Sequence, residues 1–277
     1  MKLGVGVFST DRGVGICSLA SQAEAAGLES LFLVQNTHVP VSGVALLEEE
    51  HHERDHHFLD PFVALGAAAA VTTRIKLGTG ICVAPIYDPI LLAMQVATLD
   101  QLSSGRFLFG IGVGHEDTVD NHGVSPELRG RVMRENVLAM KAIWAEDDAE
   151  FHGEFVDFAP ILTGLRPCQR PHPPILIGGQ GSRGIARTVD YGDGWMPIVY
   201  EELDLGTQML ELERRRQEAS KPTAPVTAAI FEVDKRLMEQ CAELGVDRCV
   251  AVFHTEDRDG LPAFLERYTR VADRFAD

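Results

Sequence analysis

The feature that most constrains the fold is a regular alternation of short apolar segments with longer amphipathic ones. Eight short segments have the length and composition of strands buried on both faces, as in a parallel sheet: residues 4–9, 30–35, 74–81, 107–112, 175–179, 194–198, 226–231 and 248–253. The segments between them carry apolar residues at helical spacing and often end at a glycine such as Gly27 or Gly245. Eight strand–helix units in 277 residues predict an α/β fold, a (β/α)₈ TIM barrel formed by residues 1–277 as a single domain.

Two stretches interrupt the alternation, and both are expected as insertions at the C-terminal mouth of the barrel, where barrel active sites form. Residues 36–60 are polar and rich in histidine, and residues 147–173 include a hairpin pattern, "FHGEFVDF". In the first stretch, His52 and His56 would share one face of a helix. No companion ligand motif accompanies them, so we interpret the stretch as a lid and expect no metal.

Composition limits the compartment and the partners of the chain. A formal charge of −16 disfavours nucleic acid and anionic membranes, and no apolar run is long enough to cross a bilayer. The N-terminus does not resemble a secretory signal, and the five cysteines show no paired spacing, which predicts buried, reduced thiols in a cytoplasmic protein. A small-molecule substrate and an anionic cofactor remain compatible with this charge, because backbone amides can bind phosphate.

Two glycine-rich segments follow predicted strands. In "RFLFGIGVGH" (106–115), the spacing of Gly110, Gly112 and Gly114 departs from the G-x-G-x-x-G of a Rossmann fold and lies in the fourth unit. These glycines either relieve crowding at a barrel corner or let the backbone approach a ligand. In "GGQGS" (178–182), glycines that permit positive φ and a serine that can cap the next helix predict a phosphate cradle, or only a helix-start loop.

Longer segments resemble the bacterial luciferase-like monooxygenase superfamily, and within it the deazaflavin-dependent oxidoreductases that use coenzyme F420. The matching segments are "THVPVS" (37–42), "LDPFVALGAAAAVTTRIKLGTGI" (59–81), "DPILLAMQVATLDQLSSGRFLFGIGVG" (88–114), "VLAMKAIWAEDDAEFHGEFVDF" (137–158), "RPHPPILIGG" (170–179) and "YGDGWMPI" (191–198). The resemblance implies a (β/α)₈ barrel, a flavin or deazaflavin bound at the mouth, and commonly a homodimer.

The resemblance also implies roles for particular residues of this chain. It places the cofactor phosphate on Gly178 and Gly179, with Gly181 and Ser182 beside them, and it places Gly112 and Gly114 at the same mouth. It implies a cis peptide bond between Gly80 and Ile81, against the back face of the cofactor ring.

The segment "LVQNTHVP" (33–40) departs from the family pattern. Gln35 and Asn36 stand where many relatives carry an acidic residue and a histidine beside the reactive ring carbon. Asn36 can hydrogen-bond a ring carbonyl but cannot act as a general base. His38 faces the same way as Asn36 in an extended segment, and is therefore a candidate acid or base, with His115 and Glu116 across the mouth. The alternatives are that His38 braces the loop and that His115 is solvated.

Three functions compete on this evidence. The leading one is F420-dependent hydride transfer to or from a small organic substrate, in which the protein orients the cofactor and excludes water. The second is an FMN-dependent monooxygenase, and the third is a flavin-binding protein that has lost catalysis. The glycine loops do not separate F420 from FMN, because both cofactors end their ribityl chain in phosphate. The run "ELERRRQE" (211–218) is predicted to be a solvated helix face.

Overall fold

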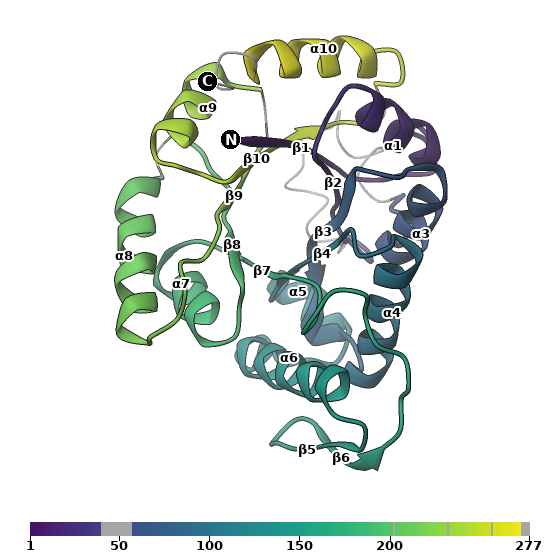
Figure 1. The fold of residues 1–277 in the computed structure, drawn as a ribbon, viewed down its shortest axis with the longest axis vertical. Helices are drawn as coiled ribbons and strands as arrows, with labels where there is room; N and C mark the ends of the chain where they lie inside the picture. The colour runs from purple at the N-terminus through teal and green to yellow at the C-terminus, as the bar shows by residue number, and fades with distance from the viewer. Residues whose placement is uncertain (40–56, 202, 232, 256, 273–277) are drawn as a thin grey trace.

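The predicted (β/α)₈ barrel is confirmed (Figure 1). The computed structural model describes residues 1–39, 57–201, 203–231, 233–255 and 257–272. Parallel strands follow one another around the barrel: β1 (Lys2–Val7), β2 (Ser30–Leu33), β3 (Lys76–Val83), β4 (Phe107–Gly112), β7 (Ile175–Gly178), β8 (Gly194–Met196), β9 (Thr227–Ile230) and β10 (Arg248–Phe253). Strand β10 pairs with β1, and bridges from Trp195 to Val226 and from Ile198 to Ala229 join β8 to β9. These contacts close the sheet.

Helices surround the strands: α1 (Ile16–Ala25), α3 (Pro61–Val71), α4 (Pro89–Leu102), α5 (Glu116–Asn121), α6 (Arg129–Ala145), α7 (Gly181–Asp190), α8 (Leu205–Glu218), α9 (Lys235–Glu243) and α10 (Leu261–Ala272), with a 3₁₀ turn η1 (Ala84–Ile86). Asp60 and Asp88 cap α3 and α4 by accepting hydrogen bonds from Val63 N and Leu91 N, each at 2.9 Å. In both helices a proline occupies the first turn, where its missing N–H costs nothing.

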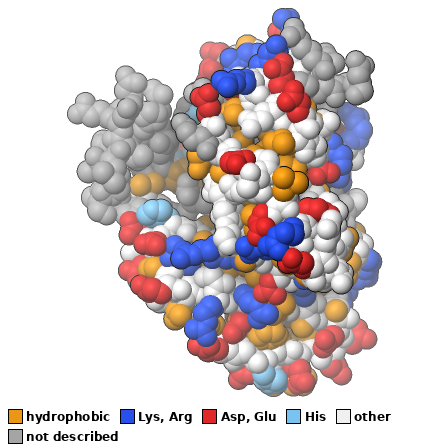
Figure 2. All heavy atoms as spheres, turned by 90° about the vertical axis from the view of Figure 1, so that its left-hand side faces the viewer, with side chains coloured by type: hydrophobic (Ala, Val, Ile, Leu, Met, Phe, Trp, Pro, Cys, Tyr) orange, Lys and Arg blue, Asp and Glu red, His pale blue; other side chains and the backbone are white. Residues whose placement is uncertain are grey.

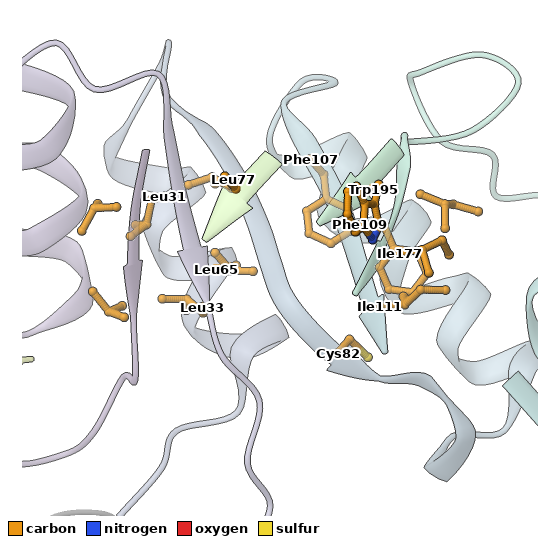
Figure 3. Packing of buried hydrophobic residues seen from close by; sticks show 14 of the residues in the cluster. Leu31, Leu33, Leu65, Leu77, Cys82, Phe107, Phe109, Ile111, Ile177 and Trp195 are labelled. Atoms are coloured by element: carbon orange, nitrogen blue, oxygen red, sulfur yellow. The ribbon is translucent and has the colours of Figure 1, made fainter. Parts of the chain in front are cut away.

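The hydrophobic core has an outer and an inner part. Side chains on the outer face of the strands, such as Leu31, Phe109 and Ile177, pack against the helices, and Leu65 of α3 meets them from outside (Figure 3). A smaller cluster fills the inside of the barrel, formed by Phe32, Leu108, Leu176, Met196 and Val250, with Ile81 and Ala229 packed against it. Successive side chains along each strand point alternately outward and inward, and this alternation separates the outer core from the inner cluster.

An ion cluster lies at the N-terminal ends of the strands, opposite the mouth. Arg248 donates to both carboxylate oxygens of Glu29 at 2.7 and 2.8 Å, and Lys76 Nζ lies 3.1 Å from the same carboxylate. Burial alone would raise the pKa of Glu29, but the hydrogen bonds and charge of Arg248, joined by Lys76, lower that pKa to about 2. Glu29 is therefore held ionised at neutral pH.

The insertion at 147–173 begins and ends at the opposite end of the barrel from the predicted one, and its hairpin packs along the outside of α6. The expected hairpin is present as β5 (Ala149–His152) and β6 (Asp157–Ile161), but it follows helix α6 and leads back to the start of β7. Arg166 donates to Ile143 O at 2.8 Å, and Gln169 donates to Phe107 O at 2.7 Å, at the beginning of β4. The prediction at the mouth was wrong because the segment follows a helix, whose end lies beside the strand starts.

The expectations for the cysteines, for membrane spans and for metal sites can be compared with the described residues. Cys82, Cys241 and Cys249 are buried free thiols, as predicted, whereas Cys17 and Cys168 are exposed. None of the helices in the described ranges is long and apolar enough to cross a membrane. In the same ranges, no group of three or more His, Cys, Asp or Glu side chains is placed to hold a metal ion, and His52 and His56 lie outside the described residues.

Candidate active site

An irregularity near the end of β3 turns Ile81 into the barrel mouth. The register between β3 and β4 shifts between Thr79 and Cys82, and the Gly80–Ile81 peptide bond is cis, as the family resemblance predicted. Cys82 consequently joins the outer core, while Ile81 packs against the inner cluster and remains half-buried. The irregularity thus presents an apolar side chain toward the opening.

Two of the predicted cofactor glycines leave room for this isoleucine. A Cβ added to Gly112 would lie 2.7 Å from Ile81 Cδ1, and one added to Gly178 would lie 2.9 Å from Ile81 Cγ2. At Gly110 a different neighbour excludes a side chain, because a Cβ added there would lie 1.9 Å from Thr79 O. Ile81 therefore lies on the backbone of β4 and β7 and forms an apolar platform at the mouth.

Gln35 connects the end of β2 to this platform. Its backbone N–H donates to Ile81 O at 3.3 Å, and its side-chain Oε1 accepts from Val83 N at 2.7 Å. Its Nε2 donates to the Tyr87 hydroxyl, and burial raises the pKa of that phenol. Only 4% of Gln35 is exposed, so this residue braces the chain on both sides of Cys82 and does not face the opening.

The loop after β7 combines open space with a helix N-terminus. Gly179 and Gly181 have φ of +107° and +67°, and no atom lies within 4 Å of a Cβ built on either. Gly178 is not in the left-handed region; its lack of a side chain serves Ile81 instead. The predicted cap is also different: Gln180 is the N-cap residue of α7, without a side-chain cap, and Ser182 lies inside the first turn.

The amides at this N-terminus are only partly engaged. Gly181 N donates to Gln208 Oε1 at 2.7 Å. Among the described residues, the amides of Ser182 and Arg183 have no side-chain acceptor, and a helix supplies none for its first turn. Two backbone donors at the positive end of the α7 dipole are therefore available to an anion.

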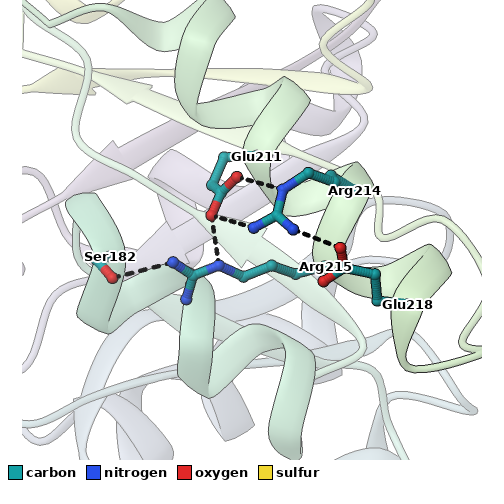
Figure 4. Close-up of polar contacts among 5 residues, drawn as sticks. All are labelled: Ser182, Glu211, Arg214, Arg215 and Glu218. Carbon is teal, nitrogen blue, oxygen red and sulfur yellow. Dashed lines mark hydrogen bonds and ion pairs between the residues drawn. The ribbon is translucent and has the colours of Figure 1, made fainter.

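A guanidinium group reaches the same turn from α8 (Figure 4). Arg215 donates to Ser182 Oγ at 3.3 Å and to Glu211 Oε1 at 2.6 Å, and Glu211 also binds Arg214. The predicted solvated face of this helix is thus wrong in part. Arg216 is 4% exposed and donates to the carbonyls of Thr188, Gly192 and Pro222.

His38 belongs to a hydrogen-bonded chain between the β2 loop and α5. Asn121 Nδ2 lies 2.9 Å from His38 Nε2, His38 Nδ1 lies 2.9 Å from Thr37 Oγ1, and Thr37 Oγ1 lies 2.9 Å from His122 Nε2. Because Nδ2 of Asn121 can only donate, neutral His38 carries its proton on Nδ1 and donates to Thr37, which donates to His122. His38 is half-buried and His122 is exposed, so the chain leads from the mouth to solvent.

The other predicted site residues differ in how far they are buried. Asn36 is half-buried, and Gly114 has φ of +73° with Val83 close to its Cβ position. His115 is exposed, with Asp117 at 3.9 Å, and Glu116 forms a 3.0 Å ion pair with Arg129. Within the described chain, no hydrogen bond or ion pair joins His38 to His115 or Glu116.

Two residues with a place in this site, and the role of a third, were not identified from the sequence. His122 and Arg215 lie far from the glycine motifs along the chain, and each enters through a helix whose orientation the sequence does not specify. Gln35 was noticed only as a departure from the family. A polar residue among the apolar residues of a strand end was the available signal that it is a buried hydrogen-bonding group.

Comparison with known proteins gives a consistent result. The luciferase-like monooxygenase family matches residues 14–241. The uncharacterized protein Rv0953c of Mycobacterium tuberculosis is 35% identical over 282 residues, covering 96% of this chain and 97% of the relative. An F420-dependent glucose-6-phosphate dehydrogenase of Kineococcus radiotolerans is 30% identical over 215 residues, covering 76% and 60%.

Another relative is named as a flavin-dependent enzyme. The oxygenase component of a flavin-dependent trigonelline monooxygenase of Acinetobacter baylyi is 34% identical over 142 residues, covering 49% of this chain and 39% of the relative. Among solved structures, an F420-dependent secondary alcohol dehydrogenase in complex with an F420-acetone adduct superposes with a TM-score of 0.80 at 18% identity, covering 98% of both chains. The chain therefore belongs to the luciferase-like monooxygenase family of oxidoreductases.

Proposed function

We propose that this protein is an F420-dependent oxidoreductase that transfers a hydride between the deazaflavin and a small organic substrate. The observation that carries the proposal is the Ile81 platform, which lies on Gly112 and Gly178 next to the open N-terminus of α7. In such a cofactor a ribityl chain joins a flat ring to a phosphate. The ring needs an apolar surface and the phosphate needs an anion site, both at the same mouth of the barrel. The Kineococcus relative supports F420 over FMN for this chain.

The residues at the mouth fit such a cofactor. The space over Gly179 and Gly181, the free amides of Ser182 and Arg183, and the nearby Arg215 would hold the phosphate. The ring would rest on Ile81, within the part of the barrel whose strand ends carry glycine. When bound, the deazaflavin supplies the hydride acceptor or donor, and the protein supplies orientation and a dry surface.

His38 is the proposed acid–base group for the substrate proton. Its Nε2 lone pair is held by Asn121, an exposed amide that a substrate hydroxyl can replace without breaking a buried contact. The proton on Nδ1 is fixed by Thr37, and Thr37 connects onward to exposed His122. A proton taken up at Nε2 can therefore be balanced by release from Nδ1 toward solvent. His115 and Glu116 are the alternatives for this role.

Cofactor binding is the decisive experiment. Purified protein is titrated with F420 and with FMN, and binding is followed by the absorbance and fluorescence of each cofactor. We expect F420 to bind at least about tenfold more tightly, a difference of about 1.4 kcal/mol. Selective FMN binding would contradict the proposal and would favour a flavin, the cofactor class in the name of the trigonelline monooxygenase relative. Tight F420 binding without turnover across alcohol, aldehyde and enone substrates would favour a non-catalytic binder.

We further propose that two copies of this barrel, each a single domain of residues 1–277, form a homodimer through α3 and α4. Neither helix carries a charged residue except Asp100, which is buried, although a quarter of the chain is charged. Their outer faces expose the large apolar side chains Val63, Val71, Leu91, Met94 and Leu102. Two adjacent helices with such faces favour a self-complementary partner over water.

Light scattering coupled to size exclusion tests the dimer. We expect a dimer for the wild type and a monomer for Met94→Lys, because a buried unpaired ammonium would oppose association. Leu210→Lys provides the control, since Leu210 is also an exposed large apolar residue but lies on α8. A monomeric wild type at micromolar concentration would refute the proposal.

A further inference from the structure

A cavity of about 520 Å³ lies beside the phosphate loop and is lined by arginines. Its walls come from three helices that begin at the mouth: the start of α5 with Glu116, the start of α6 with Arg129 and Arg131, and α7 with Arg183 and Arg187. Strands β4 and β7 are neighbours in the sheet, so the loops that follow them lie side by side. We call this cavity the arginine pocket.

The arginine pocket continues directly from the proposed phosphate site. Arg183 is the third residue of α7, so its amide faces the N-terminus of the helix while its side chain lines the pocket. Arg187 follows one turn later on the same face. The start of α7 and the pocket therefore share Arg183, so a ligand whose phosphate binds at this turn has the pocket's arginines on the next turn of the same helix.

Charge in the pocket favours an anion, although the whole chain is acidic. The lining holds four guanidinium groups and two carboxylates, Glu116 and Glu127, in a protein whose formal charge is −16. Lys and Arg side chains also gather in a band across the side of the molecule that carries α8, interspersed with acidic ones (Figure 2). A local concentration of positive charge attracts anions against the average field of the protein.

Two of the four arginines are uncommitted. Arg129 pairs with Glu116 at 3.0 Å, and Arg131 pairs with Glu154. Within the described residues, Arg183 and Arg187 form no hydrogen bond or salt bridge. A Cβ on Gly130 would lie 2.9 Å from Arg187 Nη2, so the missing side chain at Gly130 leaves room for that guanidinium. Two guanidinium groups without a partner among the described residues, each able to bind a carboxylate through two N–H groups, thus lie one helical turn apart.

We propose that the arginine pocket binds the oligoglutamate tail of F420, with Arg183 and Arg187 as the carboxylate ligands. Beyond its phosphodiester, F420 carries a chain of glutamates, which presents successive carboxylates, whereas FMN ends at its phosphate. The order along α7 matches the order along the cofactor: phosphate at the first turn, then carboxylates at Arg183 and Arg187. This inference rests on the proposed function and assigns a second recognition site to the same cofactor.

Comparing F420 with and without its tail separates this site from the rest of the cofactor. Dissociation constants are measured by fluorescence quenching for tailed F420 and for the phospholactyl form that has no glutamates. We expect the wild type to bind the tailed form about tenfold more tightly, and this preference to fall with added salt. In Arg183→Gln/Arg187→Gln the preference should disappear, with affinity for the tail-less form nearly unchanged.

The double variant needs a control with the same loss of charge. Arg236→Gln/Arg270→Gln removes two exposed arginines that pair with Glu201 and Glu266, far along the chain from α7, and it should keep the preference. Equal binding of the two forms by the wild type would overturn the tail site while leaving the F420 proposal intact. An equal loss for both forms in the Arg183/Arg187 variant would also overturn it. If neither form binds, the proposed function and this inference fall together.

Discussion

Replacing Gln35 with leucine should destabilise the barrel mouth and weaken cofactor binding. Leucine fills most of the volume of glutamine, so the change removes hydrogen bonds without opening a large cavity. The Val83 amide, which donates to Gln35 Oε1 at 2.7 Å, would lose its acceptor in a place where Val83 is 5% exposed. The hydroxyl of Tyr87 would lose its contact with Nε2.

The magnitude follows from the burial of each group. A buried N–H without a partner costs about 1–3 kcal/mol, and the half-buried Tyr87 hydroxyl adds about 0.5–1.5 kcal/mol, because water can replace part of its contact. We therefore expect the free energy of unfolding to fall by about 2–4 kcal/mol. For a barrel of this size, that corresponds to a loss of roughly 5–15 °C in the thermal midpoint.

Urea unfolding and thermal melting at one scan rate measure the stability loss, and cofactor titration measures the effect on the Ile81 platform. Gln35→Glu keeps an acceptor for Val83 N and should lose less than half as much stability. Gln217→Leu is the matched control, since Gln217 is exposed on α8 and such changes stay within about 0.5 kcal/mol. A Gln35→Leu protein as stable as this control would refute the assigned role of Gln35.

Three other changes test separate parts of the structure. Gly178→Ala should cost about 1–3 kcal/mol of stability in urea unfolding and weaken cofactor binding, because its Cβ would lie 2.9 Å from Ile81, whereas Gly15→Ala, which meets no atom within 4 Å, should be neutral. His38→Ala should lower kcat at least about tenfold in single-turnover reduction with cofactor affinity nearly unchanged, and Asn36→His should be tolerated; an unchanged rate would leave His115 or Glu116 as the candidate. The pKa of Glu29 is about 2, below its ordinary value, so its contribution of about 2–3 kcal/mol is present above pH 4.5 and is lost as the pH falls toward 2; Glu29→Gln should remove this pH dependence from urea unfolding curves.

The barrel itself could be predicted because each strand carries its own signal. Strands β4 and β10 have the predicted bounds, and the other barrel strands differ by one or two residues at their ends. Runs of branched apolar residues are buried on both faces in a parallel sheet, so the pattern is short and continuous. Helix α3 lacked such a signal: "PFVALGAAAAV" has no polar face, so its apolar residues show no helical period.

The position of the second insertion could not be read from its composition. Prolines and a hairpin pattern are found in loops at either end of a barrel, and only the preceding element decides which end they occupy. The prediction treated residues 147–173 as following a strand, whereas they follow helix α6, whose apolar period the sequence does show. The same reasoning places the described residues 36–39, which follow β2, on the side of the mouth.

The glycines of the mouth show why a sequence motif does not contain the physical reason for each of its glycines. Gly178 ends β7 and Gly179 begins the loop after it, yet Gly178 is glycine because Ile81 occupies the space of its Cβ, whereas Gly179 is glycine because its φ is +107°. The first cause involves a strand about a hundred residues earlier in the chain, and no local pattern contains it. Substitution separates the two causes: a smaller residue at position 81 should rescue Gly178→Ala, because it removes the clash, but it should not rescue Gly179→Ala, because a left-handed backbone penalises any Cβ.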